Sequence, residues 1–121
     1  METAEYYKQF LLKIYRCKQP FEIVMRDRVT EKTLGSYVVG ARRINIYYKA
    51  IKRSARDKWG FPSSLEQVLI HEYAHHIHDT EHSGVGRVHG QQFWCIYSAL
   101  MARAIRLGLM GCELTEDIIL Q

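Results

Sequence analysis

Two histidines and a glutamate stand at a spacing that suits metal chemistry. The segment His71-Glu72-Tyr73-Ala74-His75 places two imidazoles four residues apart, which on a helix means one face and about 6 Å along the axis. Two such nitrogens can hold one divalent ion at about 2.0–2.1 Å each. Glu72 follows the first histidine, so its carboxylate can act on a water molecule beside the ion. We therefore predict a zinc site with ligands His71 and His75 and with Glu72 as general acid and base.

Several residues could supply the third ligand. His89 is preferred, because a loop long enough to return precedes it and Gly90 beside it permits close backbone approach. His78 shares the helical face of His71, but about 10.5 Å of helix axis separates the two. His76 points away from the ligand pair and is interpreted as a packing or hydrogen-bonded residue. The other candidates are a loop histidine and two carboxylates, namely His82, Glu113 and Glu116.

A site with three protein ligands predicts a hydrolase. Three ligands leave one zinc position open, which is the mark of a catalytic zinc site. The bound water then has its pKa lowered towards about 7, and Glu72 can take its proton and pass it to a leaving amine. The expected enzyme is a zinc metallopeptidase that acts on a protein or peptide substrate. The oxyanion could be stabilised by one of several aromatic or basic residues, namely Tyr47, Tyr48, Arg87 and Tyr97.

The ligand pair requires a helix, and the sequence predicts one. Residues 62–66 fit a capping box with Ser63 at the N-cap and Glu66 three residues later. The apolar residues that follow are spread around much of the helix circumference, which is typical of a buried central helix. A polar loop is expected over residues 79–88 and a last helix over residues 90–107. Its predicted buried stripe is Phe93, Ile96, Tyr97, Leu100, Met101 and Ala104.

The rest of the chain predicts a small sheet flanked by helices. Apolar periodicity and β-branched runs mark the expected elements: helices over 4–17, 49–58 and 114–120, and strands over 21–25, 35–40 and 43–48. A tight connection near Ala41-Arg42 joins the last two strands. The expected fold class is therefore α+β, with a three-stranded, mainly antiparallel sheet packed on the central active-site helix.

Length and composition favour one domain over residues 1–121. The chain is 47% hydrophobic and 25% charged, as ordinary globular domains are. No apolar run approaches the roughly 20 residues that cross a membrane, and the N-terminus has no signal-peptide pattern. The three cysteines lie at wide spacings, which favours reduced thiols. We expect a cytoplasmic protein without a membrane partner.

A basic segment over residues 42–58 suggests an alternative function. Tyr47, Tyr48 and Trp59 are interleaved with or follow its basic side chains, and such mixtures suit phosphate contact and base stacking. A solvated amphipathic helix explains the same pattern. The alternative is a nucleic-acid-associated protein, either a protease acting on DNA-bound proteins or a DNA-binding module. Its candidate DNA-binding residues are Arg42, Arg43, Lys49, Lys52, Arg53 and Arg56.

The zinc pattern and the residues after it resemble a known family. The histidine pair at 71–75, Gly86-Arg87-Val88, then His89-Gly90 and Phe93-Trp94 are similar to the SprT-like zincin metallopeptidases. These include the Spartan-type proteases that cut DNA-crosslinked proteins, and short metallopeptidases predicted in bacteria and phages share the pattern. The likeness covers about residues 60–100.

The resemblance implies a zincin-like core with His71, His75 and His89 on zinc and Glu72 as acid and base. It also implies that substrate adds as a strand to the sheet edge, at segment 35–40 or 43–48. The sequence departs from the family at Tyr73, where a small aliphatic residue is commoner. It also lacks the cysteines of a C-terminal zinc ribbon. A third possibility is a regulatory protein that keeps the zinc site but acts through a partner.

Overall fold

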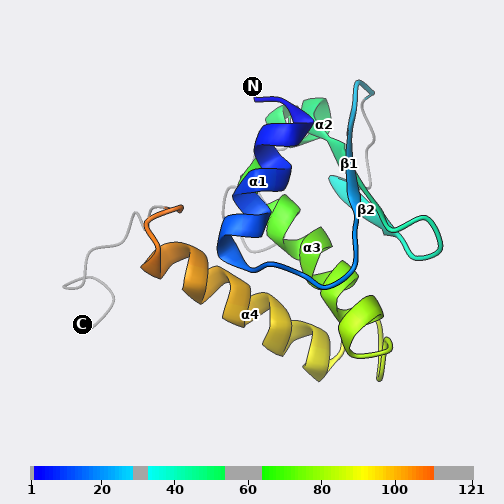
Figure 1. The fold of residues 1–121 in the computed structure, drawn as a ribbon. Coiled ribbons are helices and arrows are strands. Elements are labelled where there is room, and N and C mark those ends of the chain that lie inside the picture. Colours follow the sequence, from blue (N-terminus) through cyan, green and yellow to red (C-terminus); the bar gives the residue numbers. More distant parts are fainter. Residues whose placement is uncertain (1, 29–32, 54–63, 111–121) are drawn as a thin grey trace.

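The computed structural model describes residues 2–28, 33–53 and 64–110. Within them, one helix is followed by three strands and then by three helices, an α+β fold that confirms the predicted class (Figure 1). The elements are α1 (Ala4–Ile14), β1 (Glu22–Arg26), β2 (Gly35–Val38), β3 (Arg43–Tyr47), α2 (Tyr48–Arg53), α3 (Leu65–Glu81) and α4 (Gln91–Arg106). The predicted helix over 114–120 and residues 54–58 of the predicted helix over 49–58 lie outside the described residues.

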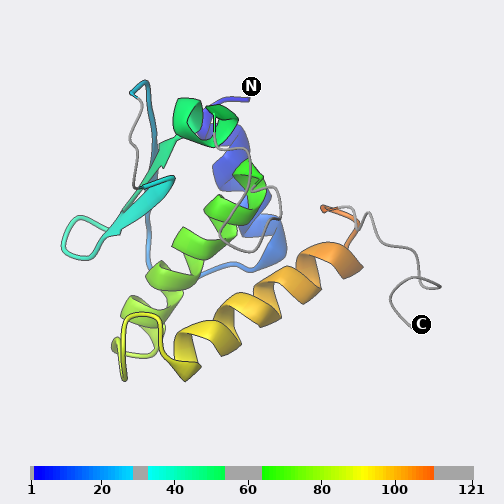
Figure 2. The ribbon, with the colours of Figure 1, turned by 180° about the vertical axis from the view of Figure 1, so that it is seen from behind.

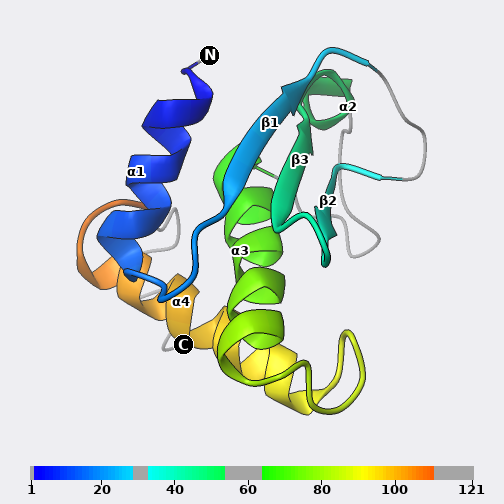
Figure 3. The same cartoon turned by 45° about the vertical axis from the view of Figure 1, so that its right-hand side comes forward.

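The sheet is mixed, so the prediction of a mainly antiparallel sheet was wrong. Its strand order is β1-β3-β2, with β1 parallel to β3 and β2 antiparallel to β3. After β1, the chain forms β2 at the opposite edge of the sheet. It then turns back as β3 between β1 and β2, so that β3 runs parallel to β1. Segment 43–48 therefore contains the central strand, and the predicted substrate edge can only be β2 (Figure 3).

The strand β3 ties the sheet to the helices. Ile44 and Ile46 alternate with Asn45, and both are fully buried, as period-2 side chains facing a core should be. On the other face, the Asn45 amide nitrogen donates to Ser36 Oγ at 3.2 Å, and its oxygen accepts from Arg26 Nε at 3.0 Å. One polar side chain thus links all three strands, while the isoleucines form the apolar base on which the helices pack.

The helix α3 is buried, as predicted, but both of its ends differ from the prediction. Ser64, not Ser63, is the N-cap, and it exchanges hydrogen bonds of 3.1 Å with Gln67 in a capping box. Two overlapping residue pairs fit this pattern, so the sequence left the register open by one residue. The helix also continues to Glu81, because Glu81 accepts hydrogen bonds from Tyr15 Oη and the Lys18 amide. The predicted loop therefore begins later, at His82.

Tyr73 explains why the first helix ends earlier than predicted. The prediction carried the first helix to residue 17, but α1 ends at Ile14. The fully buried Tyr73 hydroxyl donates to the Tyr15 carbonyl and accepts from the Cys17 amide, the latter at 3.2 Å. The backbone after α1 is thus bound to α3 instead of continuing the helix. A small aliphatic side chain at position 73 could not make this connection.

The last helix, α4, lies along α3 after a short loop (Figure 2). Its bounds agree with the prediction within one residue. Phe93, Leu100 and Ala104 are buried, while Ile96, Tyr97 and Met101 pack partly buried against the same core. No described helix has the length and apolar character needed to cross a membrane.

Candidate metal centre

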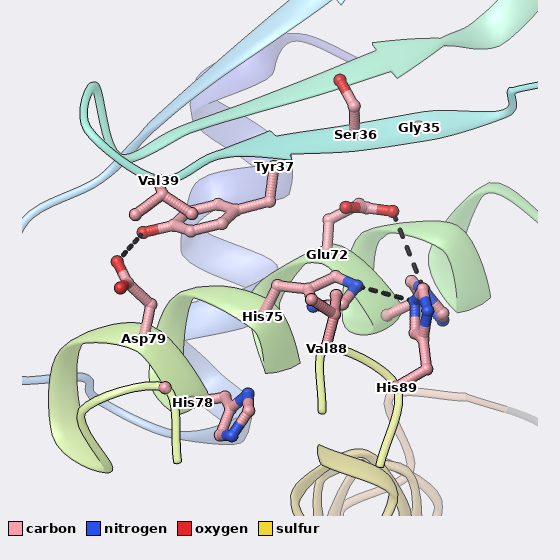
Figure 4. Close-up of a pocket in the computed structure, with 12 residues that line it drawn as sticks. Gly35, Ser36, Tyr37, Val39, Glu72, His75, His78, Asp79, Val88 and His89 are labelled. Carbon is pink, nitrogen blue, oxygen red and sulfur yellow. Dashed lines mark hydrogen bonds and ion pairs between the residues drawn. The ribbon is translucent and has the colours of Figure 1, made fainter. Parts of the chain in front are cut away.

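The structure brings His71, His75 and His89 together. The first two lie four residues apart on α3 and so share one face. The loop before α4 brings His89 back towards His75 (Figure 4). His89 Nε2 lies 3.2 Å from His71 Nε2 and 3.1 Å from His75 Nε2. One ring nitrogen from each histidine lies within 4.8 Å of the others. Of the predicted third ligands that the structure describes, His89 is the one that reaches the pair.

The spacing of the three nitrogens fits a tetrahedral zinc ion. Corners that lie about 2.05 Å from a common centre are about 3.3 Å apart, close to the distances that His89 makes. A neutral imidazole nitrogen carries either one hydrogen or one lone pair, so His89 Nε2 cannot satisfy both neighbours by hydrogen bonding. A shared cation would satisfy all three nitrogens. The donor set of three imidazoles is one that catalytic zinc sites use.

Burial keeps two of the candidate ligands in the form that binds metal. Burial, with the neighbouring His89, lowers the pKa of His71 to about 4. Burial, with the adjacent imidazoles, lowers the pKa of His75 to about 3. Both rings are therefore neutral at neutral pH, and each offers a lone pair. The 4.0 Å contact between His71 Nε2 and Glu72 Oε1 is consequently not an ion pair.

Glu72 is a buried carboxyl group beside the histidines. Its side chain projects from α3 towards β2 (Figure 4), and the residue is only 5% exposed. Oε2 has no hydrogen-bond partner among the described residues, and burial raises the pKa of the group to about 7. A buried, unpaired carboxyl oxygen costs folding free energy. Its position is therefore best explained by a partner that the protein chain does not supply, such as a water molecule or substrate.

The loop that carries His89 is fixed to the end of α3. His78 Nε2 lies 2.7 Å from the Val85 carbonyl, and the Gly84 amide donates to the His78 carbonyl at 2.8 Å. Gly84 and Gly86 have φ angles of 60° and 85°, a region that glycine enters without strain. His78 is therefore a supporting residue and not a ligand, as its distance along the helix predicted.

Aromatic side chains of α4 enclose the candidate ligands His71 and His75 on one side. The Phe93 ring stacks on His75 at 4.2 Å between centroids, and the Trp94 and Tyr97 rings lie 5.9 and 5.8 Å from His71. Phe93 is fully buried and Trp94 is 44% exposed. These rings limit the orientations that His71 and His75 can adopt, which favours convergence on one point.

A cleft of about 430 Å³ extends from the three histidines along β2. Figure 4 shows His89 at one end of this cleft and Val39 and Asp79 at the other. The proposed oxyanion residues Tyr47, Tyr48, Arg87 and Tyr97 are not among its lining residues. The structure places Tyr37 there instead, which sequence analysis missed.

The positions of Tyr37 and Asp79 depend on contacts between distant segments. The Tyr37 hydroxyl lies 2.9 Å from His76 Nδ1 and 3.1 Å from Asp79 Oδ2. The fully buried His76 places its other nitrogen 2.9 Å from the Gln19 carbonyl. This confirms that His76 is a hydrogen-bonded residue away from the ligands. The one sequence signal for Tyr37 is its two-residue spacing from Gly35, which puts both on one face of β2.

Among the remaining predicted ligands, the structure describes His82, which does not join this cluster. His82 ends α3, where its Nδ1 lies 3.4 Å from Gln92 Nε2. Glu113 and Glu116 lie outside the described residues.

The basic residues of the alternative function do not form one patch in the described part of the chain. Arg43 pairs with Glu22 and Lys49 pairs with Asp27, while Arg42 Nη1 donates to Gln19. Arg42 also precedes β3 and Lys49 follows it in α2, so the five-residue strand, about 15 Å long, separates their backbone positions. Arg56 and the side chains of Lys52 and Arg53 are not described. DNA binding stays a prediction.

Comparisons with known proteins give no match. No family model, no curated protein and no solved structure is significantly similar to this chain.

Proposed function

We propose that this chain is a zinc-dependent metallopeptidase. One observation carries the proposal: three imidazole nitrogens from α3 and its following loop lie within 4.8 Å of one another, beside a buried carboxyl oxygen without a partner. Three histidines suit zinc and leave a coordination position open. The proposal includes the likeness to SprT-like zincin peptidases, which rests on the residue pattern from His71 to Trp94.

Each residue has a separate task in the proposed hydrolysis. His71, His75 and His89 would hold the ion, and zinc when bound supplies the Lewis acidity that acidifies water and polarises a carbonyl. Glu72 Oε2 accepts the proton as water attacks the scissile carbonyl carbon. The C–N bond then breaks, and Glu72 returns this proton to the leaving nitrogen. The water thus supplies OH to the new carboxyl group and H to the new amine, so the atoms balance.

The cleft supports a polymeric substrate. It extends from the histidines past Tyr37 to Val39, along β2, which forms one edge of the sheet. An extended peptide could lie in this direction and place one of its carbonyl groups beside Glu72. Peptides that add to a sheet edge gain main-chain hydrogen bonds whatever their sequence.

The substitution Glu72→Gln tests the proposal. We expect the variant to keep one zinc per chain, because the three imidazoles remain, and to lose peptide hydrolysis by about a hundredfold to ten-thousandfold, the range for general acid–base catalysis. Glu66→Gln is the matched control, since Glu66 lies in the first turn of the same helix and outside the cleft. Zinc analysis and cleavage of a mixed peptide library give the two readouts. Full activity in Glu72→Gln, or no zinc in the wild type, would refute the proposal.

A further inference from the structure

We infer that the cleft selects substrates with a lysine or arginine within two residues of the scissile bond, through the carboxylate of Asp79. This inference rests on the proposed peptidase function. Asp79 lines the same cleft as His75 and Glu72, and it stands at the end opposite His89 (Figure 4). It is therefore placed to contact a substrate side chain and not the reacting bond.

The distance along α3 fits such a side chain. Asp79 follows His75 by four residues on a continuous helix, so it lies on nearly the same face and about 6 Å further along the axis. The four-carbon stem of a lysine places its ammonium group about 6 Å from Cα. A residue whose carbonyl lies near His75 can thus reach Asp79 with its cationic end.

The Asp79 carboxylate retains unused acceptor capacity. Among the described residues, its hydrogen-bond partner is the Tyr37 hydroxyl, at 3.1 Å. This hydroxyl has one hydrogen, and His76 Nδ1 competes for it at 2.9 Å. A carboxylate has about four lone-pair sites, so most of those on Asp79 remain for a ligand. A substrate cation would make charge-assisted hydrogen bonds to them.

The walls of the cleft suit the methylene stem of a long side chain. Val39 is 60% exposed and Val88 is 67% exposed, and both line the cleft together with Tyr37. Lysine and arginine cover apolar surface with their stems while the charged group stays with a polar partner. The cleft contains no lysine or arginine among its described lining residues, so no internal cation pairs with Asp79 there.

Other substrate side chains fit this cleft less well. An acidic side chain would be repelled by the carboxylate of Asp79, which lies within reach of it. An aliphatic side chain would contact Val39 and Val88 but would remove water from Asp79 without replacing its hydrogen bonds, which costs free energy. A lysine or arginine side chain packs its methylene stem on the apolar walls and pairs its charge with the carboxylate.

The test uses matched peptides and the substitution Asp79→Asn. The peptides differ at one position near the cleavage site, where lysine is replaced by norleucine or glutamate. We expect kcat/KM of the wild type to be highest for lysine, and Asp79→Asn to lower it by about tenfold to a hundredfold, the worth of a hydrogen bond to a charged group. Norleucine cleavage should change by less than about threefold, because asparagine keeps an oxygen for Tyr37.

Two further measurements separate specificity from structure and from catalysis. Tyr37→Phe removes the competing hydroxyl, so it should keep the lysine preference even if it lowers stability. In the inactive Glu72→Gln variant, calorimetry should show tighter binding of the lysine peptide than of the norleucine peptide. Equal cleavage and binding of the two peptides, or an equal loss for both in Asp79→Asn, would overturn the inference while leaving the peptidase proposal intact. Absence of both cleavage and binding of every peptide, with zinc bound, would refute both.

Discussion

Histidines on the same helix, α3, have ring nitrogens with two different kinds of partner. His76 is fully buried, and its two ring nitrogens lie 2.9 Å from the Gln19 carbonyl and the Tyr37 hydroxyl. His71 and His75 are partly exposed, and their Nε2 atoms face another imidazole, that of His89. The first group has protein partners that complete its hydrogen bonds. The second group has lone pairs that converge on one point.

This difference distinguishes a histidine with a structural role from the histidines that we propose to bind metal. A ring that has found a carbonyl and a hydroxyl is a satisfied polar group, and its burial adds to the rigidity of the fold. Three imidazole nitrogens that meet each other cannot all be satisfied by hydrogen bonding, because each carries only one hydrogen or one lone pair. The adjacent Glu72, with its unpaired Oε2, belongs to the second kind. Stability and chemistry are thus divided between two faces of α3.

Zinc removal should produce the largest effect that distinguishes these groups. Zinc held at about a thousand times its Kd should raise the free energy of unfolding by about 4 kcal/mol over the chelator-treated protein. His75→Ala should abolish this increment because it removes a ligand. His76→Ala should keep the increment but lower the free energy of unfolding without zinc by about 1–3 kcal/mol, since it removes the His76 partner of the Gln19 carbonyl and leaves the Tyr37 hydroxyl with Asp79 alone.

Chemical denaturation with and without zinc measures these increments, and metal analysis provides the stoichiometry. The comparison fails if His76→Ala loses zinc while His75→Ala keeps it. It also fails if zinc stabilises none of the three proteins, the wild type included.

The arrangement of the candidate ligands could be predicted from the sequence, while the contacts around Tyr37 and Asp79 could not, for a physical reason. His71, Glu72 and His75 lie within one helical turn, so their arrangement follows from local geometry. The return of His89 could be inferred from loop length and Gly90. Tyr37 and Asp79 meet only because β2 packs on α3, and this contact joins segments about 40 residues apart.

Long-range pairing also explains the errors in the fold. Nothing local indicates that β1 pairs with β3 instead of β2, so the parallel pair was missed. The end of α1 depends on the Tyr73 hydroxyl, which lies 58 residues away from its acceptor. The capping box was recognised as a type, but Ser63 and Ser64 both fit it. Local signals therefore placed the ligand helix, while tertiary contacts decided its surroundings.

Gly35→Ala should affect the catalytic group while leaving the satisfied one intact. A Cβ at Gly35 would lie 2.7 Å from Val68 Cγ1 and 3.2 Å from Glu72 Cγ, so Val68 or β2 must shift and Glu72 must also give way slightly. We expect a loss of about 1–3 kcal/mol in the free energy of unfolding, as overpacking typically costs. We also expect lower kcat with zinc content unchanged, because the three histidines do not contact Gly35.

Gly40→Ala is the control for this effect, since a Cβ there meets nothing within 4 Å. It should change the free energy of unfolding and kcat very little. Normal activity in a folded, destabilised Gly35→Ala variant would mean that the position of Glu72 does not depend on this close approach.

Tyr73→Phe should give the smallest effect and should act on stability alone. The hydroxyl donates to the Tyr15 carbonyl and accepts from the Cys17 amide. Its removal takes a partner from two partly buried backbone groups, at a cost of about 1–3 kcal/mol, with the lower end expected because Tyr15 and Cys17 are partly exposed. Zinc content and kcat should not change, since Tyr73 points to the face of α3 opposite the cleft. Tyr6→Phe, at a position 53% exposed, is the control and should be nearly neutral. If Tyr73→Phe instead lowered zinc affinity while the free energy of unfolding stayed the same, the two faces of α3 would be coupled, and the division between stability and chemistry would be wrong.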